Sequence, residues 1–201
     1  MSVKIRKRPR LVIVSGSSAS GKSSIARDIA AEMGLAFLAL DDVKEGLFDS
    51  LGVPKDDGES ERLDIAAHLL IDRLGRRILE SGVGLVVEGN FWRGRAELTL
   101  GPLVARSRAA IVHCQIAPEA MVKRIKKRVE GKKPRHPGHR DAEPDPEFVR
   151  SLEDPEEFVA ARKDLEPPNV VAPILRLDTT EDHDPDVEPI VEWVKKVTKV
   201  S

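Results

Sequence analysis

Aromatic residues are scarce in this 201-residue chain, which has no tyrosine and only 3% phenylalanine and tryptophan together. Cysteine occurs once, as Cys114, so a disulfide framework is excluded. No apolar run approaches the roughly 18 residues that span a bilayer, and the N-terminus lacks the apolar stretch of a secretion signal. We therefore expect a soluble, cytoplasmic protein without a membrane partner, in which Cys114 is a small buried apolar residue.

An excess of charge of one sign is also missing, because 33 basic residues face 34 acidic ones. The balance gives no general argument for nucleic acid or membrane as a partner. The basic residues nevertheless form two clusters, at residues 4–10 and 123–140. We expect the first cluster to be a solvated arm, as chain termini usually are.

Short apolar runs alternate with helical patterns along the chain. The runs predict strands at 11–14, 35–40, 83–87, 109–116 and 174–177. The helical patterns lie at 22–33, 43–51, 60–81, within 93–107, at 118–130, within 147–165 and at 187–197. This alternation is typical of an α/β domain, so we expect a three-layer α/β/α sandwich around a five-stranded parallel sheet.

The longest predicted helix, 60–81, has apolar residues at helical spacing. The residues expected on its buried face are Leu63, Ala66, Ala67, Leu70, Leu74 and Ile78.

Small residues fill the segment between the first strand and the first helix. It reads Gly16-Ser17-Ser18-Ala19-Ser20-Gly21-Lys22-Ser23, followed by Ser24, and fits the phosphate-binding pattern Gly-x4-Gly-Lys-Ser. Backbone N–H groups of such a loop turn inward around an anion, and the helix N-terminus adds its dipole. Lys22 would supply a charge to the β- and γ-phosphates, and the Ser23 hydroxyl a ligand to Mg²⁺. The segment predicts a binding site for ATP or a close relative.

Acidic residues follow the next two strands. Asp41 and Asp42 come after the second strand, and Glu88 ends the third. The carboxyl ends of parallel strands meet at one edge of a sheet, where ligands of such folds bind. We therefore expect these carboxylates close to the phosphate loop.

Other classes of P-loop protein fit less well. A GTPase would need a guanine-reading Asn/Thr-Lys-x-Asp segment after a later strand, and the chain has none. The chain is also short for a motor or an AAA-type machine, with no evident arginine-finger module.

The phosphate loop, the segment Asp41-Asp42-Val43-Lys44-Glu45-Gly46-Leu47, the strand ending at Glu88 and a late arginine-rich region together resemble the small P-loop kinases. The likeness is to the predicted-kinase group near chloramphenicol phosphotransferase, polynucleotide kinase and zeta-toxin-like kinases, and it covers residues 10–195. It implies one P-loop kinase-like domain over residues 1–201, with a mobile lid inserted at about 126–168.

The resemblance implies that one carboxylate of the acidic pair faces the γ-phosphate and accepts the proton of an acceptor hydroxyl. Successive side chains at a strand tip point to opposite sides, and we favour Asp41 as the base. Asp42 would then be a substrate ligand or a helix cap, although both residues could simply cap the following helix. Glu88 would hold Mg²⁺ or the substrate, or be an ordinary strand-end carboxylate.

The resemblance also implies that arginines of the lid close over the triphosphate. Arg124, Arg128 and Arg135 are the matching positions, and the alternative is a solvated charged face. His136 and His139 would contact phosphate or acceptor, or lie on the surface. A zinc site is disfavoured there, because Pro137 and Gly138 break any helix and few other ligands could complete it.

Further residues extend the predicted site at both ends. Asn90, Trp92 and Arg93 follow the third strand and are candidates for the acceptor pocket, although core packing accounts for Trp92 equally well. Thr179, after the fifth strand, resembles a residue of the adenine-side loop.

Together these features predict an ATP- and Mg²⁺-dependent phosphotransferase that acts on a hydroxyl of a small molecule such as a metabolite, nucleoside or antibiotic. The runner-up is a kinase of nucleic-acid 5′-hydroxyls, since the basic clusters could hold a phosphate backbone. Little aromatic surface is present for base stacking, which weighs against it. A third hypothesis is a non-catalytic sensor or partner protein that binds ATP.

Overall fold

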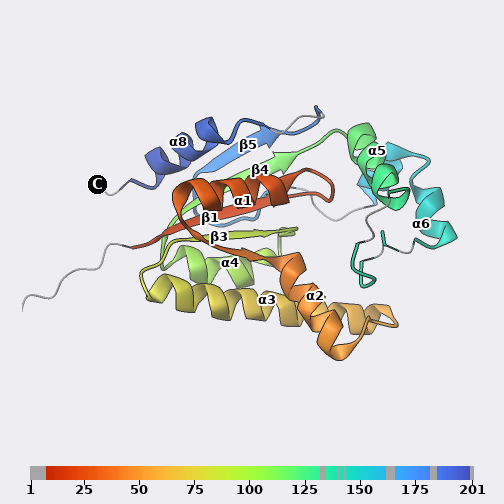
Figure 1. The fold of residues 1–201 in the computed structure, drawn as a ribbon, viewed down its shortest axis with the longest axis horizontal. Helices are drawn as coiled ribbons and strands as arrows, with labels where there is room; N and C mark the ends of the chain where they lie inside the picture. The colour runs from red at the N-terminus through yellow and green to blue at the C-terminus, as the bar shows by residue number, and fades with distance from the viewer. Residues whose placement is uncertain are drawn as a thin grey trace, which may run out of the picture.

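Five parallel strands form one sheet in the order β2-β3-β1-β4-β5 (Figure 1). This computed structural model describes residues 8–131, 135–139, 141–142, 144–161, 166–181 and 185–199. The strands are β1 (Arg10–Gly16), β2 (Ala36–Ala39), β3 (Leu85–Gly89), β4 (Arg108–Gln115) and β5 (Ile174–Asp178). The predicted five-stranded parallel sheet is confirmed.

Helices cover both faces of the sheet. They are α1 (Lys22–Met33), α2 (Leu40–Leu51), α3 (Asp57–Glu80), α4 (Ala96–Val104), α5 (Pro118–Val129), α6 (Pro146–Ser151), α7 (Pro155–Ala160) and α8 (Val187–Val197). On β1, Leu11 and Ile13 belong to the core under α3 and α4, whereas Val12 and Val14 belong to the core under α1 and α8. Figure 1 shows these two helical layers on opposite sides of the strands, which confirms the α/β/α sandwich.

The strand register brings the polar strand ends together. Val14 pairs with Glu88 and Ser15 with Gly89 across β1 and β3. Ala39, the last residue of β2, also pairs with Glu88. The start of the phosphate loop, the end of β3 and the start of α2 are therefore neighbours at the carboxyl edge of the sheet.

The start of α2 differs from the expectation. The second strand was predicted to run to Leu40, with Asp41 and Asp42 at its tip, but it ends at Ala39 and the helix begins at Leu40. Both aspartates therefore lie in the first helical turn. Acidic side chains are favoured there by the helix dipole, which explains why the helix starts early.

The buried face of α3 also differs from the expectation. Its buried residues are Ala67, His68, Ile71, Gly75 and Leu79. Leu70 and Leu74, predicted to be buried, are 37% and 45% exposed. The reason is close packing: a methyl group on Gly75 would lie only 3.0 Å from a Leu103 methyl of α4. The face with the small residues lets the helix approach its neighbours, and the leucine-rich face remains outside.

The segment expected to be the lid, residues 126–168, contains the end of α5 and the short helices α6 and α7. Asp145 and Asp154 cap α6 and α7 by accepting from the N–H groups of Phe148 and Glu157. A small apolar cluster joins α5, α6 and α7 and consists of Met121, Val122, Ile125, Phe148, Leu152 and Phe158, together with Ala19 of the phosphate loop. The predicted short helices are thus present.

Residues 4–7 of the N-terminal arm and Lys132, Lys133 and Arg140 of the second basic cluster lie outside the described residues.

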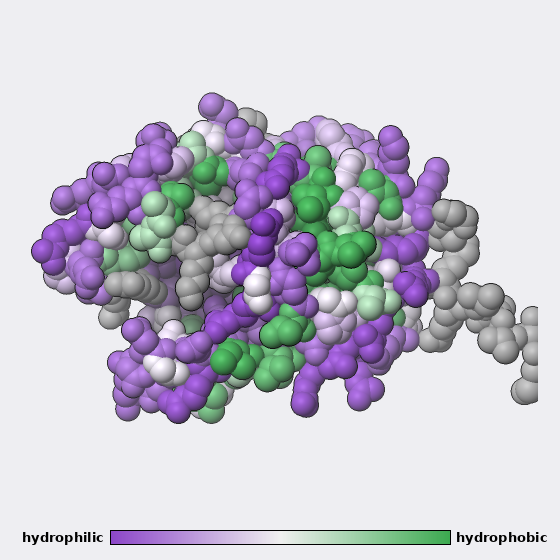
Figure 2. Space-filling view, turned by 180° about the vertical axis from the view of Figure 1, so that it is seen from behind, coloured by the Kyte–Doolittle hydropathy of each residue, from purple (hydrophilic) through white to green (hydrophobic). Residues whose placement is uncertain are grey.

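The face of the molecule drawn in Figure 2 is hydrophilic at both ends and has an apolar area over its middle. Within the described residues, none of the helices combines the length and the apolar character needed to cross a membrane.

The thiol of Cys114 is buried below the phosphate loop, and burial raises its pKa to about 12, so it is protonated at neutral pH.

The two faces of α3 make a direct test of this packing. Replacing the fully buried Ile71 by alanine should lower the free energy of unfolding by about 2–5 kcal/mol, because a cavity is left in the core. Leu74→Ala on the half-exposed face should cost clearly less. Urea unfolding of both variants measures the difference, and equal losses would contradict the observed orientation of the helix.

Candidate functional site

The phosphate loop is a tight turn between β1 and α1. Gly16 has φ 147°, and a Cβ there would lie 2.4 Å from the carbonyl oxygen of Cys114, so only glycine fits. Ala19, at the apex, has φ 63°, which is rare for a residue with a side chain. Gly21, with φ 77°, precedes the first turn of α1. The loop thereby directs the N-terminus of α1 toward the space above the sheet edge.

Lys22 and Glu88 form a buried ion pair at the base of this loop, with 3.7 Å between Nζ and Oε1. The Lys22 ammonium also donates to the carbonyl oxygen of Ser17 at 3.3 Å. The Ser23 side chain hydrogen-bonds to Glu88. Burial raises the pKa of the Glu88 carboxyl above its usual value, while the charge of Lys22 opposes the rise.

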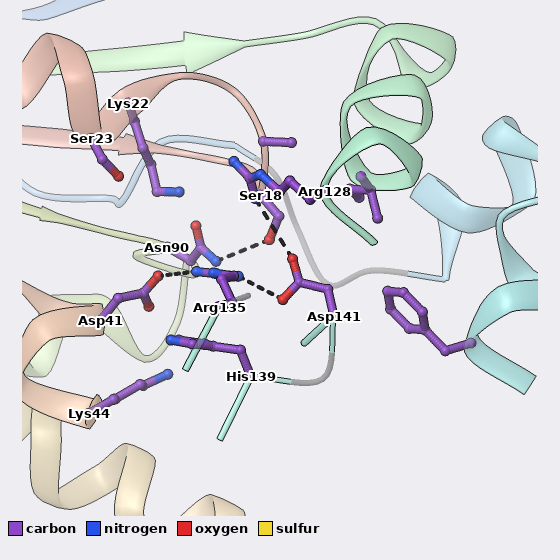
Figure 3. A pocket seen from close by; sticks show the side chains of 13 residues that line it. Ser18, Lys22, Ser23, Asp41, Lys44, Asn90, Arg128, Arg135, His139 and Asp141 are labelled. Carbon is purple, nitrogen blue, oxygen red and sulfur yellow. Dashed lines mark hydrogen bonds and ion pairs between the residues drawn. The ribbon is translucent and has the colours of Figure 1, made fainter. Parts of the chain in front are cut away.

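A cavity of about 240 Å³ opens beside the loop (Figure 3). It brings together residues from the phosphate loop, α2, the segment after β3, α5 and the expected lid. The described residues that line it are Ser18, Ala19, Lys22, Ser23, Asp41, Lys44, Asn90, Ile125, Arg128, Arg135, His139, Asp141 and Phe148. Most of these side chains are polar or charged, so the cavity suits a hydrophilic ligand.

The two aspartates of α2 have different surroundings. Asp41 lines the cavity. Asp42 is not among the described lining residues; its side chain is 60% exposed and lies 4.0 Å from Arg27 on α1. Consecutive side chains of a helix point about 100° apart, so the two carboxylates diverge here although they do not lie at the strand tip expected from the sequence.

Cations surround Asp41. Burial would raise the pKa of this carboxyl, but Lys22, Arg135, His139 and Lys44 together hold it below its usual value. Asp41 is therefore ionised at neutral pH and can accept a hydrogen bond or a proton from a ligand in the cavity.

Two of the predicted lid arginines reach the cavity. Arg135 bridges two carboxylates, with 2.7 Å to Oδ2 of Asp41 and 2.8 Å to Oδ1 of Asp141. Arg128 lies 3.8 Å from the other oxygen of Asp141. Figure 3 shows Arg135 between the two aspartates, with Arg128 on the α5 side. Burial lowers the pKa of Arg128, and neighbouring Arg135 adds to this.

Arg124 has a different environment from the other two arginines. Its guanidinium donates to the carbonyl oxygens of Ala19 at 3.2 Å, Thr179 at 2.7 Å and Glu181 at 2.8 Å. It therefore joins α5 to the phosphate loop and to the segment after β5. Thr179 itself is buried, and its hydroxyl donates to the carbonyl oxygen of Gln115.

The acceptor-pocket candidates are divided. Asn90 lines the cavity and donates to the Ser18 hydroxyl at 3.4 Å. Trp92, Arg93 and His136 are not among the described lining residues. Arg93 donates to the carbonyl oxygen of Pro167 at 3.3 Å and lies 3.8 Å from Glu166. The arginine thus fastens the end of the expected lid to the segment after β3.

Sequence reasoning missed two charged residues of the cavity, Lys44 and Asp141. Lys44 pairs with Asp64 of α3, which Arg95 also contacts at 2.8 Å. Lys44 belongs to the segment 41–47 that resembles the small kinases. It lies about one helical turn after Asp41, so helical spacing could have identified it. Asp141 had no such signal, because it follows a proline-rich loop.

The carboxylate of Glu88 and the hydroxyl of Ser23 could hold Mg²⁺. Oxygen donors at this position suit Mg²⁺, which usually binds one or two protein ligands plus phosphates and water. The described part of the chain contains no group of three or more His, Cys, Asp or Glu side chains arranged around a metal. His136 and His139 instead contact Asp49 and Glu45.

Comparison with known proteins agrees with this architecture. The family described as AAA domain matches residues 11–142. A candidate kinase from Chloroflexus aurantiacus is 28% identical, with a TM-score of 0.79 over 96% of this chain and 100% of that one. A sugar kinase from Janibacter is 20% identical, with a TM-score of 0.56 over 96% and 99%. No curated protein matches the chain.

A further structural match is to a chain of the Pnkp1/Rnl/Hen1 RNA repair complex, 17% identical with a TM-score of 0.51 over 82% of this chain and 49% of that one. At such low identity this likeness, like that to the sugar kinase, concerns the fold alone. The phosphate loop, the parallel sheet and the matched residues lead to one conclusion: the chain belongs to the AAA domain family and has the fold of the small P-loop kinases.

Proposed function

We propose that the protein transfers the γ-phosphate of ATP to a hydroxyl group of a small polar molecule, with Mg²⁺ bound. The observation that carries the proposal is that one cavity contains Lys22 and Ser23 of the phosphate loop, the ionised Asp41, and Arg128 and Arg135. Phosphoryl transfer needs little more than positioning, charge neutralisation and a base aligned with the nucleophile.

The donor end holds the triphosphate. The N–H groups of residues 16–24 and the dipole of α1 face the phosphate oxygens, and Lys22 supplies a fixed charge to the β- and γ-phosphates. Its pairing with Glu88 keeps the ammonium in place before nucleotide arrives. Bound Mg²⁺, held through Ser23 and Glu88, would neutralise part of the phosphate charge. Arg124 joins the apex of the loop to Thr179, and we expect the nucleoside on this side of the loop.

At the acceptor end, the oxygen of a hydroxyl attacks the γ-phosphorus. The bond between that phosphorus and the β,γ-bridging oxygen breaks, and the hydroxyl proton passes to the carboxylate of Asp41. The low pKa of Asp41 suits a reaction in which the proton leaves late, after negative charge on the nucleophile is already shared with phosphorus. Arg128 and Arg135 stabilise charge on the transferring group.

The cavity lining favours a small, polar acceptor. The side chains around Asp41 are Lys44, Asn90, Arg135 and His139, and none is a large apolar or aromatic carbocycle. Phe148 lines the side formed by the lid helices, where it belongs to the apolar cluster. Among the described residues beside Asp41, an aromatic antibiotic or a stacked nucleobase would find no large apolar surface to pack against.

The role of Asp41 can be separated from that of Asp42. Asp41→Asn should lower kcat by about 10²–10⁴-fold, because the proton acceptor is lost, while ATP still binds the phosphate loop. Asp42→Asn should change kcat by about threefold or less, because Asp42 lies outside the cavity. A panel of hydroxyl compounds with γ-labelled ATP provides the assay, and isothermal titration measures ATP binding. If Asp41→Asn keeps normal turnover, Asp41 is not the base.

The metal role of Glu88 has its own test. Glu88→Gln should raise the Mg²⁺ concentration needed for half-maximal turnover by about 10–100-fold, because a carboxylate that orients the ion is neutralised. ATP binding in EDTA should not weaken, because the substitution removes a negative charge near the phosphates and Lys22 still donates to the carbonyl oxygen of Ser17. In the unsubstituted protein, Mg²⁺ affinity should weaken with falling pH earlier than an ordinary glutamate would cause, since burial raises the pKa of Glu88. Glu32→Gln, on the exposed surface of α1, is the control, and an equal effect there would refute the assignment.

The nucleic-acid alternative makes an opposite prediction. A small-molecule kinase should show no salt-sensitive affinity for single-stranded oligonucleotides, measured by fluorescence anisotropy between low and physiological salt. Affinity that falls steeply as salt increases would indicate contacts to the phosphate backbone and would favour the polynucleotide kinase. If no hydroxyl compound and no oligonucleotide accepts phosphate, the ATP-binding sensor becomes the better explanation.

A further inference from the structure

Three carboxylates of α2 lie at intervals of four residues: Asp41, Glu45 and Asp49. Residues at this spacing share one face of a helix, each about one turn beyond the last. Only Asp41 belongs to the cavity, and Glu45 and Asp49 continue the face away from it. We call these three residues the acidic stripe.

The acidic stripe is matched residue by residue by the segment 135–139, which we call the lid tip. Arg135 donates to Asp41 at 2.7 Å. His139 contacts Glu45 at 2.7 Å between Nε2 and Oε1, and the Nε2 of His136 lies 3.1 Å from Asp49. Each carboxylate thus receives one side chain from a segment that is more than 80 residues away in the chain.

An aromatic contact lies at the centre of this arrangement. Phe48 is only 8% exposed, and its ring stacks on His136 at 5.6 Å between centroids. It meets the edge of His139 at 6.2 Å. Gly138 packs so closely that a Cβ would lie 2.1 Å from Cδ2 of Phe48. The lid tip therefore fits α2 by shape as well as by its hydrogen bonds to the acidic stripe.

The turn of the lid tip also fixes the proton on His136. The backbone N–H of Gly138 donates to Nδ1 of His136 at 3.0 Å, so Nδ1 is an acceptor and carries no proton. The proton is then on Nε2, where it can be donated to Asp49. The same turn that places Gly138 against Phe48 thereby orients the histidine toward the carboxylate.

We propose that Glu45 and Asp49 are positioning residues that seat the lid tip on α2 and so deliver Arg135 to Asp41. Neither residue touches the cavity; each acts through a histidine. A helix supplies fixed spacing, so two contacts one and two turns beyond Asp41 determine where Arg135 lies. The Glu45 contact should contribute more than the Asp49 contact, because its carboxylate is 37% exposed and that of Asp49 is 75% exposed.

The seating itself can be tested in the ligand-free full-length chain by limited trypsin digestion, with cleavage after Arg135 quantified by mass spectrometry. The double variant Glu45→Ala/Asp49→Ala should speed this cleavage by about threefold to tenfold, because the cleavage rate follows the population of the undocked tip. Gly138→Ala should do the same without changing any charge, since its methyl group collides with Phe48. Glu45→Ala alone should have a larger effect than Asp49→Ala alone.

Gly46→Ala is the matched control, because it adds a methyl group to the same helix at a position where, apart from the adjacent residues and nearby backbone of the helix itself, nothing lies within 4 Å. It should leave cleavage after Arg135 unchanged. Cleavage after Arg73, inside α3, reports unfolding of the whole domain. The proposal is overturned if cleavage after Arg135 fails to rise in the double variant or in Gly138→Ala, or if it rises only in parallel with cleavage after Arg73.

The consequence for catalysis rests on the proposed function and needs a second measurement. With an acceptor found in the panel of hydroxyl compounds, Glu45→Ala/Asp49→Ala should lower kcat at least threefold and leave the KM for ATP within twofold, because the phosphate loop is untouched. An unchanged kcat would overturn the positioning role even where the seating is verified. If no acceptor exists, the proposed function fails, whereas the digestion experiment still decides the seating.

Discussion

The carboxylate of Asp41 is the point at which the parts of the site depend on one another. It belongs to α2, faces Lys22 of the phosphate loop and receives Arg135 from the lid tip. Burial alone would raise its pKa, and the surrounding cations would repel one another without it. The negative charge therefore binds Arg135 and offsets the repulsion among Arg135, Lys22 and Lys44, while these cations keep the carboxylate ionised.

The local sequence was sufficient to predict those elements whose conformation depends on contacts between residues close together in the chain. The phosphate loop could be predicted because eight consecutive residues contain its glycines, its lysine and its serine. The sheet followed from apolar runs of β-branched residues, and α1 ended at Gly34 as its sequence indicated. The face of α3 could not be predicted, since leucines at helical spacing suggested one side and the close approach of Gly75 to Leu103 selected another.

The same distinction applies to the site. The sequence alone does not distinguish the three arginines Arg124, Arg128 and Arg135. Tertiary contacts show that Arg124 binds carbonyl oxygens, whereas Arg128 and Arg135 line the cavity. Arg93 was a reasonable pocket candidate from its position after β3, yet its guanidinium is held by Pro167, 74 residues later. Asp141 became visible only through Arg135 and Arg128, the two cations it contacts. Spacing identifies which side chains are near an edge, and the tertiary partners decide which of them turn inward.

Ala19 connects the two ends of the site in another way. Its backbone is held in a left-handed conformation at the apex of the phosphate loop, its carbonyl accepts a hydrogen bond from Arg124, and its methyl group belongs to the apolar cluster of α5, α6 and α7. The phosphate loop is thus also a wall of the apolar cluster under α5, α6 and α7. A change in the size or backbone shape of the apex would therefore disturb α5 and the arginine that it carries.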